Sequence, residues 1–158
     1  MATSSAFSLV CPRRSGGRRC LAGSMIGLAL LGCLPASAAV VPICAGPNRA
    51  GPVATCVYDG DTGWQDGSRW RLKGIDAPEI SRKKAECRAE QVKAVRARDR
   101  LRLILSRGFT IVATGREDRE GRSLVTMTLA DGRDVALQMM SEEIVQAWPN
   151  TGNVWCGR

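Results

Sequence analysis

Residues 57–79 read VYDGDTGWQDGSRWRLKGIDAPE, and this stretch decides the fold. Short runs of alternating apolar and polar residues are separated here by turn residues, which is typical of short antiparallel strands. Asp66-Gly67 is a strong hairpin signal between a strand at 62–65 and a strand at 69–75. With a strand-like segment at 53–58, the stretch predicts three consecutive strands.

The rest of the chain predicts two helices and two more strands. Residues 85–106 contain neither Gly nor Pro and predict a long helix that Gly108 caps. The apolar residues at helical spacing are Ala94, Ala97, Leu101, Ile104 and Leu105. Strands are expected at 109–114 and 123–129, and an apolar stripe over 135–148 predicts a second helix that Pro149 ends.

This order of elements, β-β-β-α-β-β-α, predicts an α+β fold. Five short strands are typical of a small closed barrel. We therefore expect a five-stranded OB-type β-barrel with two main helices over residues 53–158.

The first 38 residues have the layout of a secretory signal peptide. Four arginines and no acidic residue precede an apolar run over 21–34, and Pro35-Ala36-Ser37-Ala38 offers small residues for cleavage. We expect cleavage after Ala38, an extended lead-in over 39–52, and a mature protein that is secreted or periplasmic.

Two other interpretations of this N-terminal segment stay open. Leu30-Leu31-Gly32-Cys33 resembles a lipobox, which would leave the protein lipid-anchored through Cys33. A membrane anchor would need the apolar run to continue across Pro35 as far as Val41. Because Pro35 and several glycines interrupt that run, we expect no stable membrane span in the mature chain.

Composition excludes some chemistry and says little about partners. The 158 residues carry a net charge of +8, and removing residues 1–38 with their four arginines would leave 120 residues and +4. So modest an excess suits an anionic partner but equally describes a solvated surface. The sequence has no histidine, which excludes Ser-His-Asp and Cys-His catalysis and His-bound zinc.

Four cysteines follow the signal segment, and an even number in a small exported domain predicts two disulfides. Three connectivities are open, of which we expect Cys44–Cys56 and Cys87–Cys156. The first would tie the N-terminal segment to the first strand, and the second would tie the chain end to the start of the long helix. Zinc binding is disfavoured because no C-x-x-C occurs.

Acidic residues and arginines gather at the ends of predicted strands. Asp59 and Asp61 flank a glycine, and Asp76 and Glu79 flank Ala77-Pro78. Paired carboxylates offer the oxygen ligands that hard cations such as Ca²⁺ prefer, although Asp and Gly are also ordinary turn residues. Two arginines stand nearby at strand positions, Arg71 and Arg122.

Taken together, these segments resemble the staphylococcal nuclease (thermonuclease) family, over about residues 53–148. The order and spacing of four segments agree with the family pattern, and the predicted long helix lies between the second segment and the third. The segments are Val57-Tyr58-Asp59-Gly60-Asp61-Thr62, Arg71-Leu72-Lys73-Gly74-Ile75-Asp76-Ala77-Pro78-Glu79, Asp118-Arg119-Glu120-Gly121-Arg122 and Ala130-Asp131-Gly132-Arg133. The resemblance implies an OB barrel that hydrolyses phosphodiester bonds in DNA and RNA with calcium.

The resemblance also implies which residues hold the metal ion. Asp61 and Asp76 would be carboxylate ligands of Ca²⁺, and Ala77 would offer its backbone carbonyl. Asp59 would lie close to the ion, through water.

Three further roles follow from the resemblance. Glu79 would orient or deprotonate the attacking water, while Arg71 and Arg122 would bind the scissile phosphate. Guanidinium groups match phosphate oxygens in geometry, and they stabilise the negative charge that gathers in the transition state.

The sequence departs from the family pattern at four positions. Gly63 replaces a usually apolar residue, which is expected to weaken the second strand. Glu120 replaces a tyrosine beside the nucleotide, where a carboxylate would repel phosphate. In the predicted second helix, Glu143 stands for a usual Gly and Val145 for a usual Ala.

We therefore expect a secreted, calcium-dependent endonuclease that acts on DNA and/or RNA as a monomer. The alternative is a non-catalytic OB-fold module that binds nucleic acid or another partner, which Glu120 favours. The tryptophans could stack on bases, but burial is expected for all four of them: Trp64, Trp70, Trp148 and Trp155.

Overall fold

The computed structural model describes residues 39–45 and 55–157. The predicted signal segment 1–38 with Cys33, residues 46–52 of the lead-in, and residues 53–54 of the first predicted strand lie outside these residues. In the part of the chain that is described, no helix is long and apolar enough to cross a membrane.

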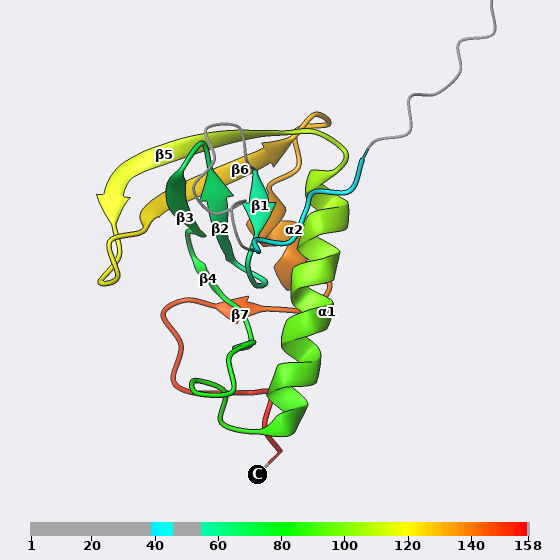
Figure 1. The fold of residues 1–158 in the computed structure, drawn as a ribbon, viewed down its shortest axis with the longest axis vertical. Coiled ribbons are helices and arrows are strands. Elements are labelled where there is room, and N and C mark those ends of the chain that lie inside the picture. Colours follow the sequence, from blue (N-terminus) through cyan, green and yellow to red (C-terminus); the bar gives the residue numbers. More distant parts are fainter. Residues whose placement is uncertain (1–38, 46–54, 158) are drawn as a thin grey trace, which may run out of the picture. The chain divides into compact units, whose positions relative to one another are not determined.

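A five-stranded mixed sheet forms the centre of the domain (Figure 1). Its strands follow the order β1-β2-β3-β6-β5, in which only β3 and β6 run parallel. They are β1 (Cys56–Val57), β2 (Thr62–Gln65), β3 (Ser68–Leu72), β5 (Phe109–Glu117) and β6 (Ser123–Leu129). Asp66 and Gly67 have φ angles of 51° and 78° at the β2–β3 turn, as the hairpin signal predicts.

The sheet is open, so the prediction of a closed barrel is corrected. β1 and β5 are the edge strands, and no pairing joins them within residues 39–45 and 55–157. The free edge of β1 is covered by the segment at 39–45, where the Cys44 N–H donates to the Val57 carbonyl at 2.9 Å. A disulfide between Cys44 and Cys56 fixes this segment, as expected.

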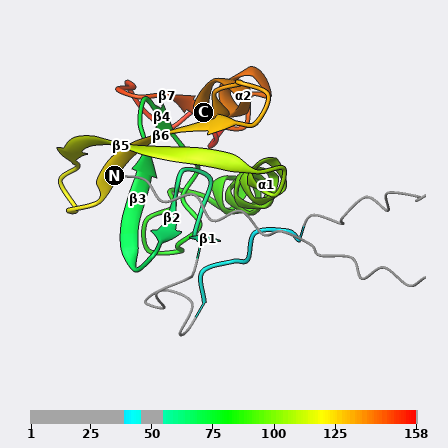
Figure 2. The same cartoon turned by 90° about the horizontal axis from the view of Figure 1, so that it is seen from above.

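The long helix α1 (Arg88–Leu105) packs beside the sheet, and Figure 2 views it end-on. All five predicted apolar residues lie on its buried face, together with Glu90. Four of them join the core cluster with residues of the sheet. Gly108 follows the helix with a φ of 87°, which confirms its predicted place at the C-terminal end.

The second helix, α2 (Val135–Ser141), is much shorter than predicted. Glu143 adopts a φ of 56°. The N–H groups of Glu143 and Ile144 donate to the carbonyls of Met140 and Met139, at 2.9 and 3.3 Å. This is the Schellman arrangement, which needs a left-handed residue and explains why a glycine suits position 143.

After α2 the chain forms a strand instead of more helix, and the predicted helix over 135–148 is therefore wrong beyond Ser141. β7 (Gln146–Ala147) pairs antiparallel with β4 (Ile75–Asp76) in a second, two-stranded sheet. β4 is itself separated from β3 by Gly74, which has a φ of 82°, so the single strand predicted over 69–75 is divided in two.

Gly63 makes room for an aromatic residue of the neighbouring strand. It pairs with Trp70 across β2 and β3, and Trp70 is 2% exposed. A Cβ atom at position 63 would lie 2.2 Å from the Cys56 carbonyl oxygen and 2.4 Å from the Trp70 ring. The indole thus fills the space beside Gly63, and β2 keeps its full predicted length.

The end of the chain returns to the start of α1 (Figure 1). A disulfide joins Cys156 to Cys87, the N-cap residue of α1, as the preferred connectivity predicts. This bond holds the segment that follows β7 against the N-terminal end of the helix.

Candidate functional site

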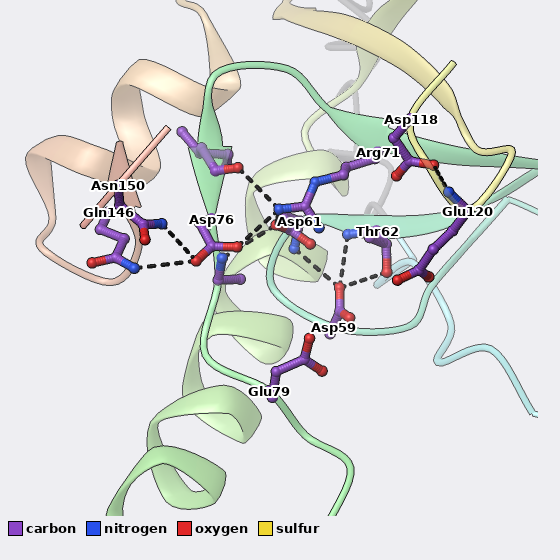
Figure 3. Close-up of polar contacts among 12 residues, drawn as sticks. Asp59, Asp61, Thr62, Arg71, Asp76, Glu79, Asp118, Glu120, Gln146 and Asn150 are labelled. Carbon is purple, nitrogen blue, oxygen red and sulfur yellow. Dashed lines mark hydrogen bonds and ion pairs between the residues drawn. The ribbon is translucent and has the colours of Figure 1, made fainter. Parts of the chain in front are cut away.

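Two carboxylates and one guanidinium group meet where β2, β3 and β4 adjoin (Figure 3). Nη2 of Arg71 lies 3.0 Å from Oδ2 of Asp61 and 2.9 Å from Oδ1 of Asp76. The pairing of β2 with β3 sets Thr62 opposite Arg71, which brings Asp61 beside it. The structure therefore brings together three of the residues predicted from the sequence.

Asp59 organises the turn that carries Asp61. Its Oδ1 accepts hydrogen bonds from the backbone N–H groups of Asp61 and Thr62, at 3.2 and 2.8 Å, and from the Thr62 hydroxyl at 2.6 Å. Gly60 is needed in this turn because a Cβ atom there would lie 2.7 Å from Ala97 of α1 and 2.8 Å from Ala77. The turn is thus packed tightly against both the helix and the segment after β4.

Asp61 is buried, and the balance of its surroundings favours its neutral form. It is 2% exposed, and its Oδ2 also accepts the Ala77 N–H at 3.2 Å. Burial raises the pKa of Asp61 well above its ordinary value, the charge of Asp59 raises it further, and Arg71 opposes both. Burial also lowers the pKa of Arg71, but the carboxylates of Asp61 and Asp76 outweigh burial and raise it.

This donor set fits a hard divalent cation. Three carboxylates, those of Asp59, Asp61 and Asp76, all act on the single guanidinium of Arg71, so negative charge is in excess. Oxygen donors in such an excess are what Ca²⁺ prefers. Among the described residues, the group of three metal-ligand side chains whose ligand atoms lie within 4.8 Å of one another is a different one, Cys87, Glu90 and Cys156. It lacks free thiolates because its two sulfurs form the disulfide.

Two amides that the sequence analysis missed hold Asp76 from the other side. Oδ2 of Asp76 accepts hydrogen bonds from Gln146 Nε2 at 3.1 Å and from Asn150 Nδ2 at 2.9 Å. Gln146 is the direct partner of Asp76 in the β4–β7 pair. Since Gln146 was predicted to lie in a helix and Asn150 to follow its end, neither amide had a predicted place near the site.

Glu79 lies at the same site, after the rigid Ala77-Pro78 segment. Figure 3 shows its carboxylate directed toward Asp59. Glu79 is half-buried, and burial is the main cause that raises its pKa, with smaller upward effects of Asp59, Asp76 and Glu90 and a downward effect of Lys84. Its backbone N–H donates to Oε1 of Glu90 at 3.0 Å.

Arg122 is the residue directly before β6. The parallel pairing of β3 with β6 sets Trp70 opposite Ser123, the residue after Arg122. Nε of Arg122 lies 2.6 Å from Oδ2 of Asp118, and Oδ1 of Asp118 accepts the N–H groups of Glu120 and Arg122, each at 2.9 Å. Burial raises the pKa of Asp118, but these hydrogen bonds outweigh it and hold the pKa below its ordinary value.

Glu120 is paired with two cations. Its carboxylate lies 3.4 Å from Nζ of Lys84 and 3.6 Å from Nη1 of Arg122. The Lys84 contact joins the β5–β6 turn to the segment that follows Glu79. The negative charge that replaces the family tyrosine is therefore compensated locally.

Glu120 and Arg122 line two clefts. The first, of about 280 Å³, also contains Asp59, Glu79 and Lys84. The second, of about 700 Å³, also contains Arg71 and Trp148. The clefts thus adjoin at Glu120 and Arg122.

The tryptophans differ from the expectation of uniform burial. Trp70 and Trp155 are buried, at 2% and 7% exposure, and Trp64 is partly buried. Trp148 is 54% exposed, and its ring centroid lies 5.9 Å from Cζ of Arg71. The turn after β7 directs the chain here, because the Trp148 N–H donates to the Gly74 carbonyl at 2.9 Å.

Comparison with known proteins gives a match to a family model. No curated protein matches the chain. The model of the family described as staphylococcal nuclease homologue matches residues 69–148, which include Arg71, Asp76, Glu79 and Arg122. Since these residues make up just over half of the chain, it belongs to the staphylococcal nuclease homologue family.

Proposed function

We propose that the domain is a secreted, calcium-dependent nuclease that hydrolyses phosphodiester bonds in DNA and/or RNA, as an endonuclease. The observation that carries this proposal is the meeting of Asp61 and Asp76 on Arg71, with Glu79 and Arg122 lining the adjoining clefts. Family membership supports the reaction class.

Asp61, Asp76 and the backbone carbonyl of Ala77 are the proposed ligands of Ca²⁺, with Asp59 close by. A bound calcium ion supplies positive charge that helps to neutralise the phosphate of the substrate. The hydrogen bonds of Asp76 to Gln146 and Asn150, and that of Asp61 to the Ala77 N–H, orient the proposed ligands before the ion arrives.

Arg71 and Arg122 are the proposed phosphate-binding groups. Each guanidinium is held by carboxylates, Arg71 by Asp61 and Asp76, and Arg122 by Asp118. Both are therefore oriented in advance, so little reorganisation accompanies the growth of charge on the phosphoryl oxygens. Removal of one such donor costs about 3–4 kcal/mol of activation free energy in comparable sites.

Glu79 is the proposed group that orients or deprotonates the attacking water. It lines the smaller cleft beside Arg122, and its carboxylate is directed toward Asp59. Burial raises the pKa of Glu79, which makes the carboxylate a stronger base than an exposed one. The reaction then needs no histidine.

The proposed substrate is a chain that continues on both sides of the scissile phosphate. A phosphate bound by Arg122 would lie where the two clefts adjoin, with a nucleotide on each side, as endonuclease action requires. Trp148 offers an exposed ring in the larger cleft on which a base can stack.

Secretion is proposed from the signal-like N-terminus and supported by the two disulfides, which are typical of exported proteins. Mass spectrometry of the N-terminus of the exported protein tests this. A chain that starts at residue 39 supports signal cleavage, whereas a lipid-modified Cys33 at the N-terminus would replace secretion with lipid anchoring.

One observation favours the alternative, a non-catalytic module that binds nucleic acid. Glu120 contacts Arg122 and competes with a substrate phosphate for it. Incubating single-stranded DNA and RNA with the oxidised protein, with calcium and then with a chelator, separates the two functions. Calcium-dependent cleavage supports the nuclease, while binding without cleavage would establish the module instead.

A further inference from the structure

Glu90 is a buried acidic residue of α1 that the proposed chemistry does not use. It is 2% exposed, and within residues 39–45 and 55–157 no lysine or arginine forms an ion pair with it. A buried carboxylate without a cation is stabilised only when several hydrogen-bond donors surround it. The identity of those donors indicates what this residue does.

One oxygen of Glu90 binds the residue proposed to act on water. Oε1 accepts the backbone N–H of Glu79 at 3.0 Å, eleven residues earlier in the chain. A glutamate at the third position of a helix ordinarily caps the backbone at the helix start. Glu90 also reaches out of the helix, to the segment that carries Glu79.

This contact completes the support of a short segment of the site. The Ala77 N–H donates to Asp61 at 3.2 Å, and the Glu79 N–H donates to Glu90 at 3.0 Å, with Pro78 between them. Both ends of the segment are thus fixed by buried carboxylates. The position of the Glu79 backbone, and with it the origin of its side chain, depends on Glu90.

The second oxygen of Glu90 binds two other segments. Oε2 accepts the Glu86 N–H at 2.8 Å and Nδ2 of Asn153 at 2.8 Å. Asn153 in turn accepts the N–H groups of Trp155 and Cys156, at 2.8 and 3.3 Å. The disulfide from Cys156 to Cys87 closes this segment onto the start of α1 (Figure 1).

We infer that Glu90 is a positioning residue for Glu79, held in place by the C-terminal segment that the Cys87–Cys156 disulfide closes. A continuous set of contacts runs from the disulfide through Asn153 and Glu90 to the Glu79 backbone. This inference rests on the proposed nuclease function, because it assigns Glu90 its effect through the group that acts on water.

A double-mutant cycle tests the inference. Glutamine at position 90 keeps the size of the side chain, but an NH₂ group replaces one of the two carboxylate oxygens. This NH₂ group cannot accept hydrogen bonds, so the contacts that the replaced oxygen makes in the wild type are lost. Glu90→Gln should therefore lower kcat by about 10- to 100-fold with little change in KM, as expected for a displaced reacting group. In a Glu79→Gln background, the same change at position 90 should lower kcat less than about twofold, because the residue it positions is already disabled.

Glu86→Gln is the matched control. Glu86 is exposed, lies at the same end of α1, and loses the same charge, while its backbone N–H still donates to Glu90. Its kcat should stay within about twofold of the wild type, since surface substitutions of this kind change little. The melting temperature of every variant is measured, so that unfolding is not mistaken for loss of positioning.

Hydrogen exchange of the Glu79 amide gives a readout that does not need activity. In Glu90→Gln this amide should exchange at least about tenfold faster than in the wild type, while core amides of β6 keep their rates. Unchanged exchange at Glu79 would overturn the inference.

The two disulfides provide a further comparison. Replacing Cys87 and Cys156 with serine should lower kcat at a temperature where the protein is still folded. Replacing Cys44 and Cys56 should lower only the melting temperature, because that bond supports the edge of β1. Equal effects of the two replacements on kcat would contradict the proposed set of contacts.

Other outcomes separate the inference from the proposed function. A wild-type protein that cleaves nucleic acid, together with a Glu90→Gln variant of full kcat, would overturn the inference alone. An equal loss of kcat from Glu90→Gln in the wild type and in the Glu79→Gln background would also overturn the inference alone. A wild type that cleaves nothing with calcium would overturn the proposed function, and the role of Glu90 with it.

Discussion

Arg71 and Asp61 form an ion pair with 3.0 Å between Nη2 and Oδ2, and the side chains are only 15% and 3% exposed. The same nitrogen lies 2.9 Å from Asp76. Arg71 therefore holds together the two carboxylates that we propose as metal ligands, and its removal leaves a buried acidic group without its cation.

Arg71→Ala should destabilise the calcium-free protein by about 3 kcal/mol, because breaking a buried pair leaves Asp61 uncompensated. Calcium should restore part of this loss, as a ligand that binds only the folded state adds about 2.7 kcal/mol at 100 times its Kd. Urea unfolding with calcium and with a chelator measures both effects. Arg69→Ala is the control, because Arg69 is exposed and its Nη2 contacts the Glu120 carbonyl. An equal calcium effect on both variants would contradict the proposed metal ligands.

Asn150→Ala should weaken calcium binding by about tenfold with little loss of stability. Asn150 donates to Asp76 at 2.9 Å, and partners that orient metal ligands commonly change affinity by this amount. Isothermal titration with calcium gives the affinity directly. Thr151→Ala is a neighbouring control at an exposed position and should bind calcium as the wild type does.

Gly63→Ala should destabilise the protein by about 1–3 kcal/mol, because the added methyl group overlaps the Cys56 carbonyl and the Trp70 ring. A second change that empties the space, Trp70→Leu, should make alanine at position 63 less costly. The free energies of unfolding of the two single variants and the double variant give the coupling. Strict additivity would show that the Cys56 carbonyl, and not the Trp70 ring, sets the cost of a side chain at position 63.

Glu143→Gly should stabilise the protein by about 1 kcal/mol. Glu143 has a φ of 56° at the end of α2, and a left-handed conformation costs residues other than glycine about that much. Ser141→Gly, in the last helical position, should have the opposite sign, since glycine is unfavourable inside a helix. Thermal unfolding of both variants is sufficient, and a destabilised Glu143→Gly would contradict the assigned end of α2.

The Asp118–Arg122 pair predicts a pH-dependent stability. The pKa of Asp118 is lowered in the folded protein, so its contribution is fully present above the unfolded pKa of about 3.9 and is lost as the pH falls through the lower folded value. Asp118→Asn keeps an oxygen for the backbone N–H groups but loses the charge. The wild type should be more stable than this variant by about 1–2 kcal/mol at pH 7, and the difference should shrink as the pH falls below the unfolded pKa of about 3.9. A difference that does not depend on pH would contradict the pairing.

Most of the fold could be predicted from local sequence signals. The Asp66-Gly67 turn, the strand at 62–65, the buried face of α1 and both disulfides are present as expected. The turn, the strand and the helix face depend on neighbouring residues or on periodicity alone, whereas the disulfide pairing was one of three open connectivities and joins cysteines 12 and 69 positions apart. Closure of the barrel depends on pairing between distant edge strands, and no local pattern determines that pairing.

The end of the second helix was wrong for a similar reason. The apolar residues over 135–148 keep helical spacing, yet one left-handed residue, Glu143, reverses the chain and turns 146–147 into β7. The glycine usual at this family position was the signal that could have shown the break. Missing the break also hid Gln146 and Asn150, which hold Asp76.

The sequence motifs predicted which residues meet at the candidate site, but they did not predict the contacts that support those residues. Asp61, Arg71 and Asp76 meet because β2, β3 and β4 are consecutive strands. The contacts of Glu90 with Asn153 and of Glu120 with Lys84 join residues 63 and 36 positions apart. No sequence pattern pairs such residues without a fold.

Cleavage of circular single-stranded DNA tests the central claim most directly. The oxidised wild type should linearise the circle and then fragment it with calcium and leave it intact with a chelator. Glu79→Gln should cut at least about 100-fold more slowly, while Glu86→Gln should match the wild type. Equal cutting by Glu79→Gln and the wild type would contradict the role given to Glu79, and a folded wild type that binds the circle without cutting it would contradict the nuclease itself.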